Sequence, residues 1–145
     1  MPRTSRTRTV ACDPAEIWAV VADPHHFPRW WPRVERVEAV DGGRWTKVFM
    51  TRKGRPVRAD FEVLESREPA VRAWRQELED SPFERVLGDA VTEVHIEPAG
   101  AGAEVTISQR QKLRGMARLG GLLVRRATGR VLDEALDGLE RACVR

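Results

Sequence analysis

The stretch VACDPAEIWAVVADPHHFPRWWPRVERVE, residues 10–38, contains two helix-start signals followed by a segment rich in proline and tryptophan. At Asp13-Pro14 the aspartate can act as the N-cap, the proline fits the first helical turn, and Glu16 can reach back as in a capping box. Asp23-Pro24 repeats the signal and starts a shorter turn, because the prolines that follow prevent a long helix. The pattern predicts two short helices in succession.

The segments on either side of this stretch are predicted to be strands. Residues 3–11 are rich in threonine and lack helix signals. After the second helix, turn signals such as Asp41-Gly42-Gly43 and Lys53-Gly54 separate short runs with valine, phenylalanine, tryptophan and threonine. Short connections between consecutive runs are typical of an antiparallel meander. The runs give six further strands, near residues 34–40, 44–52, 55–65, 70–78, 84–97 and 103–113.

After Gly115 the apolar period changes from two to about 3.6, which predicts a long C-terminal helix. The repeating apolar residues include Leu119, Leu123, Ala127, Val131, Ala135, Leu139 and Cys143. Gly120-Gly121 and Gly129 each weaken such a helix by roughly 1 kcal/mol relative to alanine, so we expect a kinked start and a firm second half. The sheet is the only apolar surface large enough to hold this helix.

Length and composition indicate a single domain spanning residues 1–145. Hydrophobic residues make up 41% and charged residues 32% of the chain, as is ordinary for a soluble globular protein. The longest apolar runs are too short to span a bilayer, and the basic N-terminus lacks the apolar core of a secretory signal. We therefore expect neither a membrane span nor a secretory leader.

The two cysteines, Cys12 and Cys143, lie near opposite ends of the chain. A disulfide between them is one option, and a pair of structural thiols is the other. We favour the thiols, and with them a reducing cytoplasmic location. No spacing of histidines, cysteines or acids suits a metal, so neither a metal nor another cofactor is expected.

The charge does not indicate a nucleic-acid partner. Lys and Arg number 25 against 22 Asp and Glu, for a net charge of +3. The densest basic segment, residues 124–130, is interrupted by apolar positions and followed by acids. Because nucleic-acid binding needs the basic excess gathered on one face, a solvated helix face is the better interpretation.

Alternation along the strands assigns one face of the sheet to the interior. The third strand, residues 44–52, has apolar groups on both sides, so its parity does not settle which side faces inward. The inward residues of the other strands include Val57, Ala59, Phe61 and Val63; Trp74, Gln76 and Leu78; Val86, Gly88, Ala90, Thr92, Val94 and Ile96; and Val105, Ile107, Gln109, Gln111 and Leu113.

Two features of this inward face predict a cavity. Gly88, Ala90 and Thr92 form a row of small side chains, too small to fill the space beneath a helix packed about 10 Å away. Gln109 and Gln111 place amides on the same face, where each needs a partner or costs on the order of 1–3 kcal/mol. A bulge that turns the glutamines outward, or helix side chains that fill the gap, are the alternatives.

The order of elements resembles the helix-grip fold of the START-like (SRPBCC) superfamily over essentially the whole chain. Residues 10–38 are similar to the opening of the polyketide cyclase/dehydrase group of bacterial proteins, and RRATGRVLDEALDGLERAC, residues 125–143, fits the last helix of that group. The resemblance implies an α+β domain in which a seven-stranded curved antiparallel sheet wraps around the C-terminal helix. It also implies an apolar cavity with its entrance near the short helices, Trp30 packed as a wedge or as plain core, and Trp31 near the rim.

This resemblance leads to three functional hypotheses. The first is binding of a small hydrophobic molecule, such as a lipid, a quinone or a polyketide-like compound. The second is a cyclase or dehydratase, which needs an inward acid or base that Val57, Ala59, Phe61 and Val63 do not supply. The third is a protein-interaction module that docks through Trp31 and Phe83, and a homodimer is left open. The predicted ligand-binding residues are Phe27, Trp30, Trp31, Phe49, Val57, Ala59, Phe61, Trp74, Gln76, Gly88, Ala90, Thr92, Val94, Ile107, Gln109, Gln111, Leu119 and Leu123.

Overall fold

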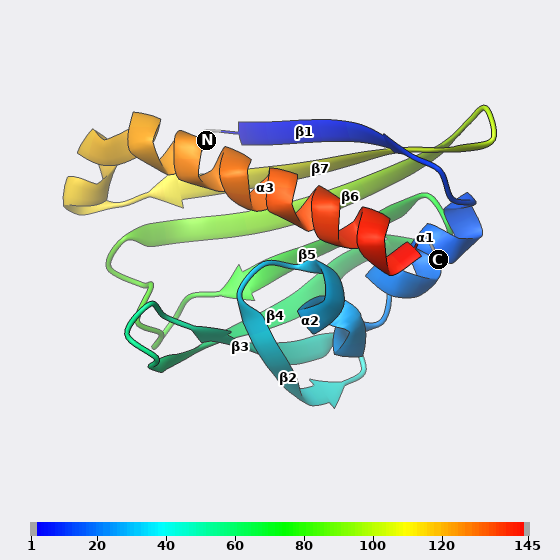
Figure 1. Cartoon of the computed structure of the whole chain (residues 1–145). Helices are drawn as coiled ribbons and strands as arrows, with labels where there is room; N and C mark the ends of the chain where they lie inside the picture. The colour runs from blue at the N-terminus through cyan, green and yellow to red at the C-terminus, as the bar shows by residue number, and fades with distance from the viewer. Residues whose placement is uncertain (1–2, 144–145) are drawn as a thin grey trace.

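The computed structural model describes residues 3–143, apart from the side chains of residues 116 and 117. The elements in chain order are β1 (Arg3–Val10), α1 (Pro14–Val21), η1 (Pro24–His26), α2 (Phe27–Trp30), β2 (Val34–Asp41), β3 (Arg44–Met50), β4 (Pro56–Arg67), β5 (Val71–Glu77), β6 (Leu87–Ala99), β7 (Gly102–Leu113), η2 (Gly115–Gly120) and α3 (Gly121–Cys143). The strands form one antiparallel sheet in the order β1-β7-β6-β5-β4-β3-β2. Helix α3 crosses one face of the curved sheet, and α1 and α2 lie beside its C-terminal end (Figure 1). The predicted helix-grip architecture is confirmed.

The two helix starts at the N-terminus differ in their capping. Asp13 stands at the N-cap of α1, but its side chain makes no capping hydrogen bond, so the predicted capping box is wrong. The Asp13 backbone carbonyl instead accepts the N–H groups of Glu16 and Ile17 at 3.0 and 3.1 Å. Asp23 does act as a cap, because its carboxylate accepts the backbone N–H of His25 at 3.0 Å. Helix α1 therefore begins with a proline in its first turn and without a side-chain cap.

Strand β6 begins at Leu87, three residues later than the sequence pattern predicts. The residues before it form a turn, in which the Ser81 hydroxyl donates to the Leu78 carbonyl at 2.6 Å and accepts the Phe83 N–H at 3.2 Å. Val86 therefore lies outside the strand and is 44% exposed, so its predicted inward position is wrong. The same turn brings Phe83 toward the interior.

Helix α3 has the predicted kinked start and firm second half. A 3₁₀ segment, η2, precedes it and gives way to α-helix at Gly120-Gly121. Buried residues of α3 begin only at Thr128. Leu119 and Leu123 are 80% and 69% exposed, so their predicted place on the buried stripe is wrong: the turns before Thr128 do not lie on the sheet.

Helix α3 is held against both α2 and β1. A Cβ added at Gly138 would lie 2.7 Å from the Cα of Trp30, so only glycine permits this close approach of the two backbones. On the other side, β1 contributes Arg6, which pairs with Asp133 of α3 at 3.5 Å. The position of α2 therefore depends on a small residue in the last third of the chain.

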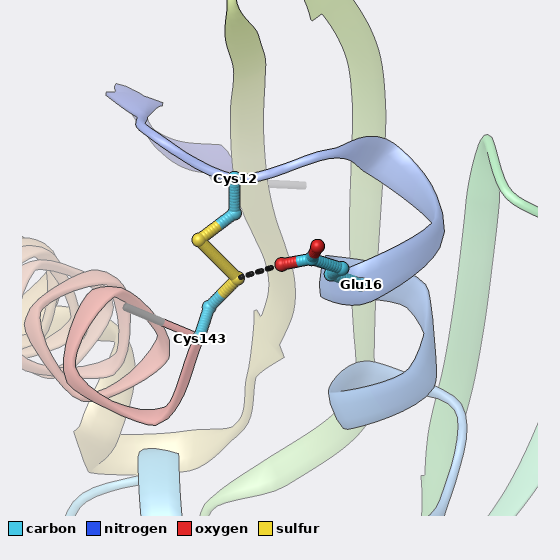
Figure 2. A group of neighbouring side chains, drawn as sticks. All are labelled: Cys12, Glu16 and Cys143. Carbon is cyan, nitrogen blue, oxygen red and sulfur yellow. Dashed lines mark hydrogen bonds between the residues drawn. A yellow bond between two sulfur atoms is a disulfide. The ribbon is translucent and has the colours of Figure 1, made fainter. Parts of the chain in front are cut away.

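A disulfide joins Cys12, which follows β1, to Cys143 at the end of α3, and corrects the prediction of two thiols (Figure 2). The two Cα atoms are 6.4 Å apart although 131 residues separate them in sequence. The expectation of a reducing compartment rested on two unpaired thiols, so it loses its support. Within residues 3–143, no helix is long and apolar enough to cross a membrane.

Removing this crosslink is expected to lower the free energy of unfolding by about 2–5 kcal/mol, because it closes a very long loop in the unfolded chain. Guanidinium unfolding of the oxidised protein and of the Cys12→Ala/Cys143→Ala variant measures the difference. Dithiothreitol should destabilise the parent and leave the variant unchanged. Coincident transitions for all four samples would contradict the prediction.

Candidate ligand-binding cavity

A cavity of about 600 Å³ lies on the inward face of the sheet, between the strands and the segment that follows α2. Its walls come from β3, β4, β5, β6 and β7, from the residues after α2, and from the turn before β6. The lining residues are Trp31, Arg33, Lys47, Phe49, Met50, Thr51, Arg52, Val57, Ala59, Phe61, Trp74, Gln76, Phe83, Thr92 and Gln109. Arg33, Thr51 and Arg52 are exposed and lie at the mouth, whereas Lys47, Ala59 and Trp74 are buried.

The proline- and tryptophan-rich segment packs its aromatic rings beside this cavity, with Trp31 in the lining and Phe27 and Trp30 in the core behind it. Phe27 stacks on Trp30 of the same helix with ring centroids 5.3 Å apart, and on Trp45 of β3 at 5.8 Å. Trp31 meets Trp74 of β5 edge to face at 6.0 Å. Such stacked and edge-to-face pairs add about 0.5–1.5 kcal/mol each to the free energy of burial. Prolines 28 and 32 hold the backbone that presents these rings.

Lys47 of β3 lies at the centre of this aromatic cluster. Its side chain is 1% exposed, and its Nζ lies 3.9 Å from the ring centroid of Phe27, 4.3 Å from that of Trp31 and 4.6 Å from that of Phe61. A fourth ring, Trp74, is 5.3 Å away. The faces of aromatic rings attract a cation, so the cluster partly offsets the loss of water around the ammonium group.

The position of Lys47 in the sheet explains how a lysine fits there. Its cross-strand neighbours are Val37 of β2 and Ala59 of β4. The small Ala59 side chain leaves room for the long aliphatic stem. Among the described residues, no hydrogen bond or ion pair reaches the amine. Burial consequently lowers the pKa of the Lys47 amine well below its ordinary value of 10.5.

The two inward glutamines have different surroundings. Gln109 lines the cavity and donates from Nε2 to the Thr92 hydroxyl at 3.0 Å. Gln111 accepts at Oε1 from the Thr128 hydroxyl of α3 at 3.1 Å, so it ties the sheet to the helix and lies outside the cavity lining. Both amides therefore point inward, and both have the partner that burial requires.

The predicted ligand-binding residues divide into those that line the cavity and those that do not. Lining residues among them are Trp31, Phe49, Val57, Ala59, Phe61, Trp74, Gln76, Thr92 and Gln109. Buried in the packed core instead are Phe27, Trp30, Ala90, Val94 and Ile107. Gly88 lies in a separate polar hollow, because the ladder between β6 and β7 is irregular between Leu87 and Asp89 and turns it toward Arg114. Gln111 packs on α3, and Leu119 and Leu123 are exposed.

Lys47 is the main residue that sequence reasoning missed. Val57, Ala59, Phe61 and Val63 supply no acid or base, but Lys47 of the neighbouring strand adds an amine to the lining residues. A partial signal was present, because Trp45, Lys47 and Phe49 alternate along β3 and Trp45 and Phe49 are the two aromatic residues of that strand, but Val48 and Met50 on the other side left the inward face open. Trp31 also differs from the expectation, since at 6% exposure it lies beneath the surface and not at the rim.

Ligand atoms of Cys12, Glu16 and Cys143 lie within 4.8 Å of one another, a grouping of the kind that can hold a metal ion. Figure 2 shows the Glu16 carboxylate directed at Cys143, with Oε2 3.9 Å from Sγ. Because the two sulfurs are bonded to each other, neither is a thiolate, and a thiolate is the form that binds metals. As oxidised, this cluster does not fit a metal site.

Comparison with known proteins identifies the fold. The family model described as polyketide cyclase/dehydrase and lipid transport matches residues 1–144. A crystal structure of a protein from Thermus thermophilus is 20% identical, with a TM-score of 0.75 over 98% of this chain and 97% of that one. A START superfamily protein from Mycobacterium smegmatis is 16% identical, with a TM-score of 0.77 over 97% and 96% of the two chains.

A structure from a biosynthetic pathway is also similar. The di-domain ARO/CYC BexL from the BE-7585A biosynthetic pathway is 21% identical, with a TM-score of 0.79 over 98% of this chain and 46% of that one. No functionally curated protein matches the sequence significantly. At these identities the structures establish the shared fold, and the START-like resemblance seen in the sequence is confirmed.

Replacing Lys47 by methionine is expected to stabilise the protein at pH 7 by on the order of 1–3 kcal/mol, because it removes a buried polar group without a partner. The gain should shrink as the pH rises toward 10.5. Between the lowered native pKa and the unfolded value of 10.5, the unfolded parent binds more protons than the native parent, so raising the pH stabilises the parent but not the variant.

Guanidinium unfolding of the parent and of Lys47→Met at pH 7 and pH 10 gives the stability difference between the two proteins and its change with pH. Arg125→Met, at an exposed position of α3, is the matched control for loss of one basic side chain. A Lys47→Met protein that is less stable at pH 7, or a difference that does not change with pH, would show that the amine is already well accommodated as a cation.

Proposed function

Because the chain belongs to the polyketide cyclase/dehydrase and lipid-transport family, we propose that its cavity binds a small, mainly apolar molecule that carries a polar group. The observation that carries this proposal is the hollow of about 600 Å³ on the inward face of the sheet. Ligand cavities in proteins commonly measure about 300–1,000 Å³ and combine apolar walls with a few polar groups. A lipid, a quinone or a polyketide-like compound falls within this size and chemistry.

The apolar part of the ligand would lie against the strand side chains. Phe49, Val57 and Phe61 supply aliphatic and aromatic surface from β3 and β4, and Phe83 adds a ring from the turn before β6. Each square ångström of apolar surface removed from water contributes about 25 cal/mol, so this wall supplies the main driving force for binding.

The polar part of the ligand would be oriented by hydroxyl and amide groups. The Thr92 hydroxyl accepts a hydrogen bond from Gln109, so its own proton is available for a ligand oxygen. Gln76 adds a second amide to the wall, from β5. These groups fit a ligand carbonyl or hydroxyl.

A cyclase or dehydratase activity is the second candidate, and the observation that favours it is the amine of Lys47 in the cavity wall. A lysine whose pKa is lowered by burial is a neutral amine, and so a base, at lower pH than an exposed lysine, whereas an amide is a poor base. Turnover of a polyketide-like substrate by the parent, lost in Lys47→Met, would favour the enzyme over a binding protein. Binding without turnover would favour the first candidate.

Filling the cavity is expected to weaken ligand binding. Val57→Trp places an indole in the lining, and we expect the affinity for the neutral fluorescent probe N-phenyl-1-naphthylamine to fall about tenfold or more. Val86→Trp makes the same substitution at a 44% exposed position outside the cavity and serves as the matched control. Fluorescence titration of the three proteins measures the effect.

Circular dichroism of each variant verifies that it is folded before titration. The proposal requires that the parent binds the probe, that Val86→Trp binds it equally well, and that Val57→Trp does not. If the parent fails to bind any apolar probe, or if a folded Val57→Trp binds as tightly as the parent, the cavity is not a ligand site.

A further inference from the structure

The amine of Lys47 lacks the partner that a buried lysine ordinarily has. Charged side chains are almost never fully buried unless they are paired. Among the described residues, the groups around Nζ are aromatic rings, and no carboxylate is bonded to it. Lys47 is also one of the residues that line the cavity, although it is only 1% exposed. The cavity is thus the side from which a counter-ion can reach the amine.

The remaining charges of the cavity have the same sign. Arg33 and Arg52 lie at the mouth, and together with Lys47 they give the described lining three basic side chains. No aspartate, glutamate or histidine is present in that described lining. A cavity with walls of one charge sign concentrates ligands of the opposite sign.

We propose that the ligand of this cavity is a mainly apolar carboxylic acid whose carboxylate pairs with the Lys47 ammonium. This inference rests on the proposed function, and it names the chemical class of the ligand. The apolar body lies along β3 and β4, and the acid group reaches the inner end of the cavity, where the aromatic cluster surrounds the amine. Arg33 and Arg52 attract the anion to the mouth and contact it only during entry.

Binding of the carboxylate is coupled to the uptake of one proton by Lys47. In the empty protein the buried amine is neutral at pH values above its lowered pKa. The acid enters as its carboxylate, Lys47 takes up one proton from solvent, and the product is a buried ammonium–carboxylate pair. The aromatic faces of Phe27 and Trp31 then stabilise the ammonium together with the ligand carboxylate. An ester or an alcohol of the same length can only accept or donate a hydrogen bond at this position, so it gains less.

The test compares decanoic acid, methyl decanoate and 1-decanol as competitors of N-phenyl-1-naphthylamine, below their aggregation concentrations, on the full chain at pH 7. The parent should bind the acid at least tenfold more tightly than the ester or the alcohol. In Lys47→Met the ratio of acid to ester affinity should fall to about one. Arg125→Met, which removes a basic side chain outside the cavity lining, should keep the parent's ratio.

Each outcome has a distinct meaning. If the parent binds the neutral compounds as tightly as the acid, or if Lys47→Met keeps the acid preference, the carboxylate pairing is wrong while the apolar binding function stands. If the parent binds none of the compounds and no probe, the binding function itself fails, and the pairing fails with it.

The pH dependence of the acid affinity is a second readout, and a lysine with only a structural role would not produce it. Because binding takes up a proton, the acid affinity of the parent should decrease as the pH rises above the lowered pKa of Lys47, and the ester affinity should not. The neighbours of Lys47 that the structure places around it do not titrate: they are Val37, Ala59, Phe27, Trp31, Phe61 and Trp74. Arg33 and Arg52 are the charged side chains at the mouth. An acid affinity that stays constant between pH 7 and pH 10 would overturn the proposal.

Discussion

Burial of one lysine without a counter-ion is the constraint on which the interior of this protein depends. Lys47 can occupy the inward face of β3 only because aromatic rings surround its amine and a small alanine stands opposite its stem. The same cluster leaves the indole N–H groups of Trp30, Trp45 and Trp74 without partners among the described residues. Each such group costs about 1–3 kcal/mol. Where proteins keep buried polar groups without hydrogen-bond partners, the place is commonly a functional site.

The aromatic cluster in turn depends on how the N-terminal helices are held. The prolines around α2 allow only a single turn of helix, which presents Phe27, Trp30 and Trp31 toward the sheet. Gly138 lets α3 approach the backbone of α2, and the disulfide fixes the end of α3 to the segment before α1. The inner wall of the cavity is thus assembled from the first and last parts of the chain.

Strand positions and the face of most strands could be predicted from the sequence, because alternation and turn residues are local signals. Long-range features could not: the pairing of Cys12 with Cys143 spans 131 residues, and the irregular pairing that turns Gly88 away from the cavity depends on the β7 partner. Lys47 was a different kind of omission. The inward face of β3 could not be read from alternation, because apolar residues lie on both sides of that strand, and lysine is almost never fully buried without a partner.

The protonation state of Lys47 is the most direct test of this account. Nitrogen-15 NMR of the lysine side chains, titrated between pH 5 and pH 12, reports the pKa of each amine separately, and Lys47→Met assigns the signal. The account predicts a Lys47 midpoint well below 10.5 in the empty protein, shifted upward when decanoic acid is added. A midpoint that coincides with those of the exposed lysines, with or without the acid, would contradict it.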